Sequence, residues 1–299
     1  MFDSTLWSGS AHPALAQRIA AYLNAPLWPV PVQPFADGET AIQIPPSLKT
    51  GTLRIVQSLC RPVNHHLMEL LLMVDAAHRI GCKHMTLAIP YFAYARQDSS
   101  AKLVADLLAI RPIDRIITLD LHHAGLENVF SMPVTHLHST PLFAEDIQKK
   151  LATDCTQGLK PLIVSPDVGG AHRAQKLASS LKTDFTVLDK KALKNHAISN
   201  IRNRFCIIVD DIVDTGKTVC NATHFLKQQG AGPVFAYATH AVLSNNALEI
   251  LLESDIDKLA LTDTIPLSLV NQQHLNEKSN HTKKLEILSV AALFAEAIL

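Results

Sequence analysis

The chain has 299 residues, of which 47% are hydrophobic, and 27 basic residues balance 27 acidic ones, giving zero formal net charge. This composition is typical of a globular protein with apolar material for about two domains, and it excludes a strongly basic nucleic-acid-binding surface as a global feature. We expect neither a signal peptide nor a membrane span, because no basic start and no run of about 18 uncharged apolar residues occur. Five scattered cysteines without a Cys-x-x-Cys pair indicate reduced thiols in a cytoplasmic protein and argue against a zinc site.

Short apolar runs alternate with amphipathic segments along the chain. The sequence predicts strands at residues 53–56, 85–89, 115–119, 162–164, 185–188, 205–209, 234–238 and 258–261. It predicts helices near residues 12–23, 65–80, 101–110, 141–151, 170–181, 217–229, 245–253 and 289–298. Alternation of this kind indicates parallel sheets with right-handed crossovers. A division near residue 140 gives two halves of similar size and element order.

The first polar motif is the segment Phe35-Ala36-Asp37-Gly38-Glu39-Thr40. An Asp-Gly pair between apolar stretches predicts a hairpin turn. Considered by itself, the segment therefore indicates a structural turn more strongly than a binding site.

The second motif, residues 91–98, follows an apolar run and ends in Arg96, Gln97 and Asp98. An arginine after a strand and an aromatic-rich loop has the fork geometry that holds phosphate. A surface ion pair between Arg96 and Asp98 is the structural alternative, and such pairs contribute little to stability.

A third motif, Asp120-Leu121-His122-His123, comes directly after the predicted strand 115–119. A histidine beside an aspartate at a strand end is suited to a metal or a phosphate oxygen. A purely structural histidine is the alternative.

The fourth motif, residues 164–173, contains Asp167 in a turn and the pair Gly169-Gly170 at the start of a predicted helix. The glycines allow a ligand to approach the backbone closely, and an aspartate oxygen suits magnesium. A helix N-cap is the alternative role for Asp167.

The most informative motif follows the apolar run 205–209 and reads Asp210-Asp211-Ile212-Val213-Asp214-Thr215-Gly216-Lys217-Thr218. The run predicts a buried parallel strand that ends before the acids, and ligands of parallel α/β sheets bind at such ends. The acids suit sugar hydroxyls or a hard cation, whereas the following glycine and hydroxyls suit a phosphate at a helix start. A P-loop would require glycine at Asp211, so that interpretation fails. An acidic turn that caps the next helix is the structural alternative.

Over nearly the whole chain these motifs resemble the ribose-phosphate pyrophosphokinases, or phosphoribosyl pyrophosphate (PRPP) synthases. The resemblance implies an α/β fold of two tandem phosphoribosyltransferase-like domains, each a mainly parallel sheet flanked by helices. Residues 1–140 would form the N-terminal domain on the ATP side, and residues 141–299 the C-terminal domain with the ribose 5-phosphate loop. The last helix is expected to pack back on the first domain.

The same resemblance assigns roles to individual residues. It implies an ATP site, partly completed by a neighbouring subunit, formed by Phe35, Asp37, Glu39, Arg96 and Gln97. It implies a ribose 5-phosphate site formed by Asp210, Asp211, Asp214, Thr215, Gly216, Lys217 and Thr218. It places Mg²⁺ near His122 and Asp167, and it makes Lys190 the catalytic lysine.

Three departures from the family pattern stand out. Only Ser99 and Ser100 separate Asp98 from the next helix, whereas the family has a longer basic loop there, so we expect no allosteric control by ADP. Ala192 replaces an arginine of the mobile catalytic loop. Lys217 stands where the family usually has glycine, so a different loop geometry is expected if this position needs positive φ.

The predicted activity is the transfer of the pyrophosphoryl group of ATP to O1 of ribose 5-phosphate, giving PRPP and AMP, by a cytoplasmic homo-oligomer that requires magnesium and binds neither nucleic acid nor membrane. Three alternatives stay open. They are a weakly active or inactive homologue with a regulatory or scaffolding role, a phosphoribosyltransferase that consumes PRPP, and a nucleotide-binding sensor.

Overall fold

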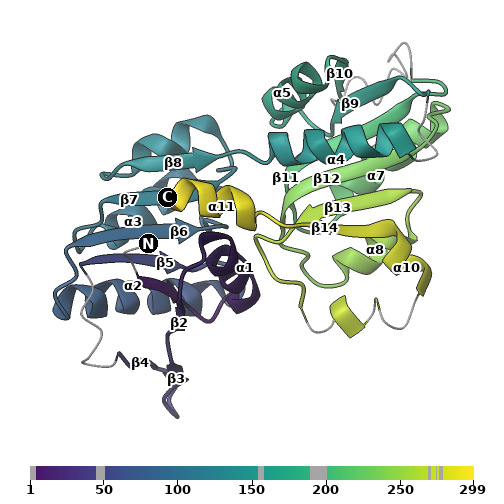
Figure 1. The fold of residues 1–299 in the computed structure, drawn as a ribbon. Coiled ribbons are helices and arrows are strands. Elements are labelled where there is room, and N and C mark those ends of the chain that lie inside the picture. The colour runs from purple at the N-terminus through teal and green to yellow at the C-terminus, as the bar shows by residue number, and fades with distance from the viewer. Residues whose placement is uncertain are drawn as a thin grey trace. The chain divides into compact units, whose positions relative to one another are not determined.

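The computed structural model describes residues 5–44, 51–153, 158–188, 201–268, 271–273, 275 and 279–299. Contacts between Cα atoms divide the chain into two compact units. Unit 1 comprises residues 1–137, 264–266 and 289–299, and unit 2 comprises residues 138–263 and 267–288. Each unit is built around one parallel sheet of six strands with helices beside it, which confirms the predicted α/β class (Figure 1).

The sheet of unit 1 has the strand order β2-β1-β5-β6-β7-β8, and every neighbouring pair is parallel. Its strands are β1 (Thr5–Ser8), β2 (Leu27–Pro29), β5 (Thr52–Val56), β6 (His84–Ile89), β7 (Arg115–Leu119) and β8 (Val134–Leu137). Its helices are α1 (Pro13–Leu23), α2 (Val63–Arg79), α3 (Asp98–Leu108), the 3-10 helix η1 (Ala124–Val129) and α11 (Ala291–Ile298). The C-terminal helix α11 packs beside α1, and Arg54 Nε on β5 donates a hydrogen bond of 3.2 Å to the carbonyl of Ile298.

A short antiparallel hairpin, β3 (Val32–Pro34) and β4 (Thr40–Ile42), extends outward from unit 1 (Figure 1). Its turn carries Gly38 at φ 94°, a conformation that glycine adopts without steric cost. The hairpin predicted from the Asp-Gly pair is therefore confirmed.

The sheet of unit 2 has the order β10-β9-β11-β12-β13-β14 and is also parallel throughout. Its strands are β9 (Pro161–Ser165), β10 (Asp184–Val187), β11 (Phe205–Val213), β12 (Val234–Ala241), β13 (Lys258–Thr262) and β14 (Leu285–Leu288). Its helices are α4 (Thr140–Thr153), α5 (Ala171–Leu181), α7 (Lys217–Gln228), α8 (Ala247–Glu253) and α10 (Ser279–Lys284).

The central strand β11 is buried on both faces. Phe205, Ile207 and Val209 belong to one hydrophobic cluster, together with residues of α4 and α5. Cys206 and Ile208 belong to a second cluster, with residues of α7 and α8. Successive side chains of a strand point to opposite faces, so a central strand covered on both sides reads as a continuous apolar run.

Two details differ from the sequence predictions. Strand β11 continues to Val213, so Asp210 and Asp211 lie within the strand rather than after it, because β11 keeps pairing with β12 as far as Val213. The strands β1, β2 and β8 were not predicted, since their three or four residues show too little periodicity to be distinguished. Among the described residues, every helix is too short or too polar to cross a membrane.

Candidate active site

An acidic pair in β11 is held by one arginine of α5. Arg173 Nη1 lies 3.4 Å from Asp210 Oδ1, and its Nη2 lies 3.3 Å from Asp211 Oδ1. All three side chains are largely buried, at 16%, 15% and 6% exposure. Two adjacent buried carboxylates repel each other, so a cation beside both is what lets them share this position.

Proton binding at this pair is perturbed. Burial raises the pKa of Asp210 well above the ordinary value of an aspartate, the charge of Asp211 raises it further, and Arg173 lowers it. The two carboxyl groups therefore titrate as a pair and retain a proton to higher pH than an exposed aspartate does. A ligand that brings hydroxyl donors or a cation to the pair would favour loss of that proton.

After the acids the chain turns into helix α7. Gly216 has φ 75° and directly precedes the helix, and a Cβ at this position would lie 2.9 Å from Leu251 Cγ. The residue that needs positive φ is therefore Gly216, while Lys217 is the first helical residue, so lysine at this position does not require the altered geometry considered above. Thr215, Lys217 and Thr218 are exposed, beside backbone N–H groups that open a helix and so favour an anion.

The loop after β9 is braced by its own side chains. Asp167 Oδ1 accepts a hydrogen bond of 3.0 Å from Gly170 N, and Ser165 Oγ donates one of 2.7 Å to the Asp167 carbonyl. A Cβ on Gly170 would lie 2.7 Å from Ser165 Oγ, so this glycine is required for packing. Asp167 is exposed and helps to close the turn before α5, and α5 then supplies Arg173 to the acids.

In unit 1, Arg96 and Gln97 lie at the start of α3, and both are exposed. Asp98, the first residue of α3, lies 2.7 Å from His123 Nε2. This contact links the start of α3 to the loop after β7, where His122 is also exposed. This contact, between Asp98 and His123, joins the segment that carries Arg96 and Gln97 to the loop that carries His122.

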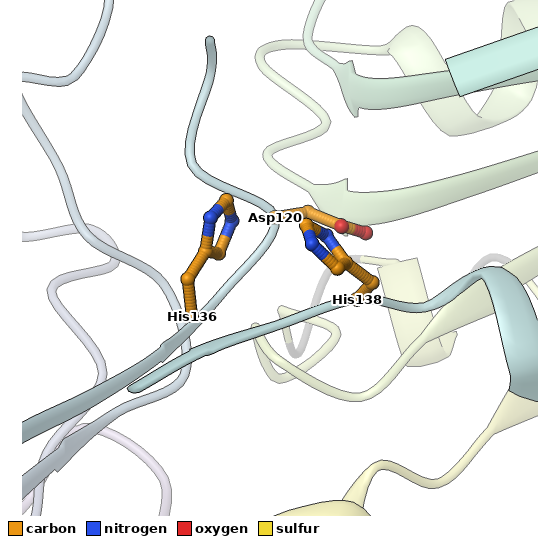
Figure 2. A group of neighbouring side chains, drawn as sticks. All are labelled: Asp120, His136 and His138. Atoms are coloured by element: carbon orange, nitrogen blue, oxygen red, sulfur yellow. The ribbon is translucent and has the colours of Figure 1, made fainter. Parts of the chain in front are cut away.

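A cluster that the motifs did not reveal joins Asp120, in the loop after β7, to two histidines of a later segment. Asp120, His136 and His138 each offer one ligand atom, and these atoms lie within 4.8 Å of one another (Figure 2). Asp120 is buried and has φ 39°, an uncommon conformation for a residue other than glycine. His136 lies on β8, so no local sequence signal connects it to this loop.

The hairpin carries the remaining residues predicted to bind ATP. Phe35 is 58% exposed, and Asp37 and Glu39 are exposed as well. Asp37 Oδ1 accepts a hydrogen bond of 3.1 Å from Glu39 N, which braces the turn. Glu39 also lines an open pocket of about 520 Å³ between the hairpin and α2. The predicted catalytic residue Lys190 and the substituted position Ala192 lie outside the described residues.

An all-parallel sheet with an acidic strand end and a following helix start places this chain among α/β proteins that bind a ligand at the carboxyl ends of their strands. Residues 4–111 match the N-terminal domain of ribose phosphate pyrophosphokinase, and residues 165–299 match the phosphoribosyl synthetase-associated domain. The ribose-phosphate pyrophosphokinase of Haemophilus influenzae is 42% identical over 315 residues, covering 100% of this chain and 96% of the relative. That of Burkholderia pseudomallei is 41% identical over 306 residues, covering 97% and 92%.

A solved structure agrees with these matches. The crystal structure of phosphoribosylpyrophosphate synthetase from Mycobacterium smegmatis superposes with a TM-score of 0.87 and 32% identity, covering 99% of this chain and 97% of the other. The chain belongs to the ribose-phosphate pyrophosphokinase family.

Proposed function

We propose that this chain transfers the pyrophosphoryl group of ATP to O1 of ribose 5-phosphate, giving PRPP and AMP. The observation that carries the proposal is the acidic pair of β11 followed at once by the start of α7, in a chain that matches the family over both units. A sugar phosphate needs acceptors for its hydroxyls and N–H donors for its phosphate, and this segment supplies both.

In this proposal, Asp210, Asp211 and Asp214 accept hydrogen bonds from the ribose hydroxyls, directly or through a cation. Thr215, Gly216, Lys217 and Thr218 hold the 5-phosphate, to which the first N–H groups of α7 donate. The O1 hydroxyl loses its proton and attacks the β-phosphorus in line, and the bond between that phosphorus and the oxygen retained by AMP breaks. Such a transfer depends on positioning and charge neutralisation more than on covalent catalysis.

Arg96 and Gln97 hold ATP, with the guanidinium on phosphate oxygens. Lys190 supplies a positive charge that stabilises the migrating group. These assignments rest on the match of residues to the family motifs and on the exposure of Arg96 and Gln97 at the start of α3.

The donor set fits magnesium. Asp167 presents an exposed carboxylate oriented by the N–H of Gly170, and an oxygen ligand of this kind, together with substrate phosphates, is the environment that Mg²⁺ prefers. His122 would complete the set from the loop after β7. When bound, the ion would neutralise charge on the triphosphate.

The exposed hairpin is the basis for a homo-oligomer. Phe35 would stack on the adenine and Asp37 and Glu39 would accept hydrogen bonds from it, in the site of a neighbouring copy. An aromatic side chain that is 58% exposed on an outward-reaching hairpin is consistent with a role that a partner completes.

Release of AMP from ATP in the presence of ribose 5-phosphate and magnesium tests the activity, with PRPP identified by mass. We expect AMP and PRPP in a one-to-one ratio, and we expect Asp214→Asn, which preserves side-chain size, to abolish turnover. Absence of turnover in the wild-type chain, with both ligands still bound, would instead identify a regulatory homologue.

Mixing two inactive variants tests the shared site. Asp37→Ala/Glu39→Ala lacks the hairpin acceptors, and Asp214→Asn lacks a ribose acceptor. If sites are shared, oligomers exchanged between the two variants contain some sites with neither lesion, so activity returns. Failure to regain activity, despite exchange shown by native mass spectrometry, would confine each site to one chain.

A further inference from the structure

His136 forms a bridge between two parts of unit 1 that are separate in sequence. It lies on β8, opposite Thr118 of the neighbouring strand β7, and its side chain is 8% exposed. Its Nε2 accepts a hydrogen bond of 2.9 Å from Leu121 N, and its Nδ1 lies 2.5 Å from Glu127 Oε1. The backbone N–H of Leu121 is a donor, so Nε2 carries no proton, and the proton of the neutral ring is on Nδ1, facing the Glu127 carboxylate.

The bridge holds a conformation that the backbone does not favour. Asp120 has φ 39°, and its N–H donates to the Leu137 carbonyl at 3.0 Å. The N–H of the next residue, Leu121, donates to His136 Nε2 instead of to a backbone carbonyl. Two successive N–H groups of the loop are thus anchored to adjacent residues of β8, and the residue that follows them is His122. Strained backbone of this kind persists where the surrounding contacts enforce it.

We propose that His136, oriented by Glu127, is a positioning residue that fixes the Asp120–His122 loop so that His122 faces the magnesium-bound triphosphate. This inference rests on the proposed function for the role of His122, and on geometry alone for the role of His136. Groups that lie behind a metal ligand fix its orientation, and their removal commonly lowers metal affinity or activity.

The alternative is that His136 itself binds a metal, together with Asp120 and His138 (Figure 2). Both ring nitrogens of His136 already face other groups, Leu121 N and Glu127 Oε1. A metal on Nε2 would displace the hydrogen bond from Leu121, and a metal on Nδ1 would displace the contact with Glu127. The positioning role retains both interactions.

Two conservative variants separate the roles of the ring nitrogens. In His136→Gln the side-chain amide oxygen reaches the place of Nε2 and still accepts from Leu121 N–H, whereas in His136→Asn the shorter amide reaches only the place of Nδ1. We expect His136→Asn to raise the KM for MgATP roughly 10-fold or more, with the KM for ribose 5-phosphate unchanged within about twofold. We expect His136→Gln to have a KM for MgATP much closer to that of the wild-type chain.

The contact between His136 and the Leu121 amide can also be measured without any enzymatic turnover. Hydrogen exchange at the Leu121 amide should accelerate in His136→Asn and remain slow in His136→Gln, and the nitrogen chemical shifts of His136 should show a proton on Nδ1 only. If the wild-type chain makes no PRPP, the proposed function is wrong. Hydrogen exchange at the Leu121 amide and the affinity for MgATP in the two variants would still test the positioning role of His136.

An equal rise of the KM for MgATP in His136→Gln and His136→Asn would overturn the proposal. It would also be overturned if the KM values for both substrates changed in parallel, or if hydrogen exchange at the Leu121 amide were unaltered in His136→Asn. The alternative metal role is tested with zinc. Tight zinc binding that His138→Asn and His136→Gln both abolish would assign the cluster to a metal and displace the positioning role. We expect no such binding.

Discussion

Arg173 Nη1 lies 3.4 Å from Oδ1 of Asp210, so the helix that begins after the Asp167 loop reaches across to the acidic end of β11. The same guanidinium contacts Asp211 at 3.3 Å. These contacts couple two segments assigned to substrate binding and make the charge state of the acids dependent on a single cation.

Replacing Arg173 with glutamine should move the pH dependence of activity. Arg173 lowers the pKa of Asp210, so its removal raises that pKa, and at a given pH a smaller fraction of Asp210 is ionised to accept ribose hydroxyls. The acid limb of kcat/KM for ribose 5-phosphate should therefore shift to higher pH, by roughly one unit or more. Lys176→Gln, on the exposed side of the same helix, is the matched control and should leave the limb in place. If kcat/KM for ribose 5-phosphate fell by the same factor at every pH, Arg173 would instead be a direct contact of the substrate.

Gly216→Ala should weaken binding of ribose 5-phosphate. An alanine would need φ 75°, and its Cβ would approach Leu251 Cγ to 2.9 Å, so the turn into α7 would have to rearrange. Strain of this kind costs about 1–3 kcal/mol, which corresponds to roughly 5- to 150-fold in affinity. Calorimetric titration of ribose 5-phosphate measures the loss, and ATP binding should be unaffected. Gly51→Ala, where the added Cβ meets no atom within 4 Å, should behave as wild type, and unchanged affinity in Gly216→Ala would contradict the assignment of this turn.

Phe205→Ala should destabilise unit 2. Phe205 is fully buried on β11, and its ring lies 4.8 Å from that of Phe235 in an edge-on contact. Truncation of a buried phenylalanine costs about 3–5 kcal/mol through lost transfer free energy and the cavity that remains. Urea unfolding of the variant measures this cost. Phe185→Ala on the edge strand β10, where the ring is 41% exposed, should cost far less.

Inhibition by ADP should be competitive with ATP and nothing more. Helix α3 runs from Asp98 through Ser99 and Ser100 without interruption, so the longer basic loop that the family has after this aspartate has no counterpart here. Without that loop we expect no separate regulatory response, and initial rates at several ATP concentrations should give lines that share one maximal velocity. A fall in maximal velocity with increasing ADP would show a second site.

Much of the fold followed from local pattern. The run 205–209 indicated a strand covered on both faces, and the Asp-Gly pair indicated a hairpin. Both edge strands of the unit 1 sheet, β2 and β8, did not follow, because they have only three and four residues. The extent of β11 beyond Val209 depended on pairing with β12, which overrides the low strand preference of aspartate.

The sequence by itself determined the α/β class and the positions of the polar motifs after the apolar runs, because backbone periodicity and turn chemistry depend on neighbouring residues. Only the tertiary structure decided which distant side chains control those motifs. Arg173 reaches Asp210 across 37 residues, and His136 reaches Leu121 across 15. Such pairs form where parallel strands end together, and their partners are chosen by strand order and packing, which no local pattern specifies.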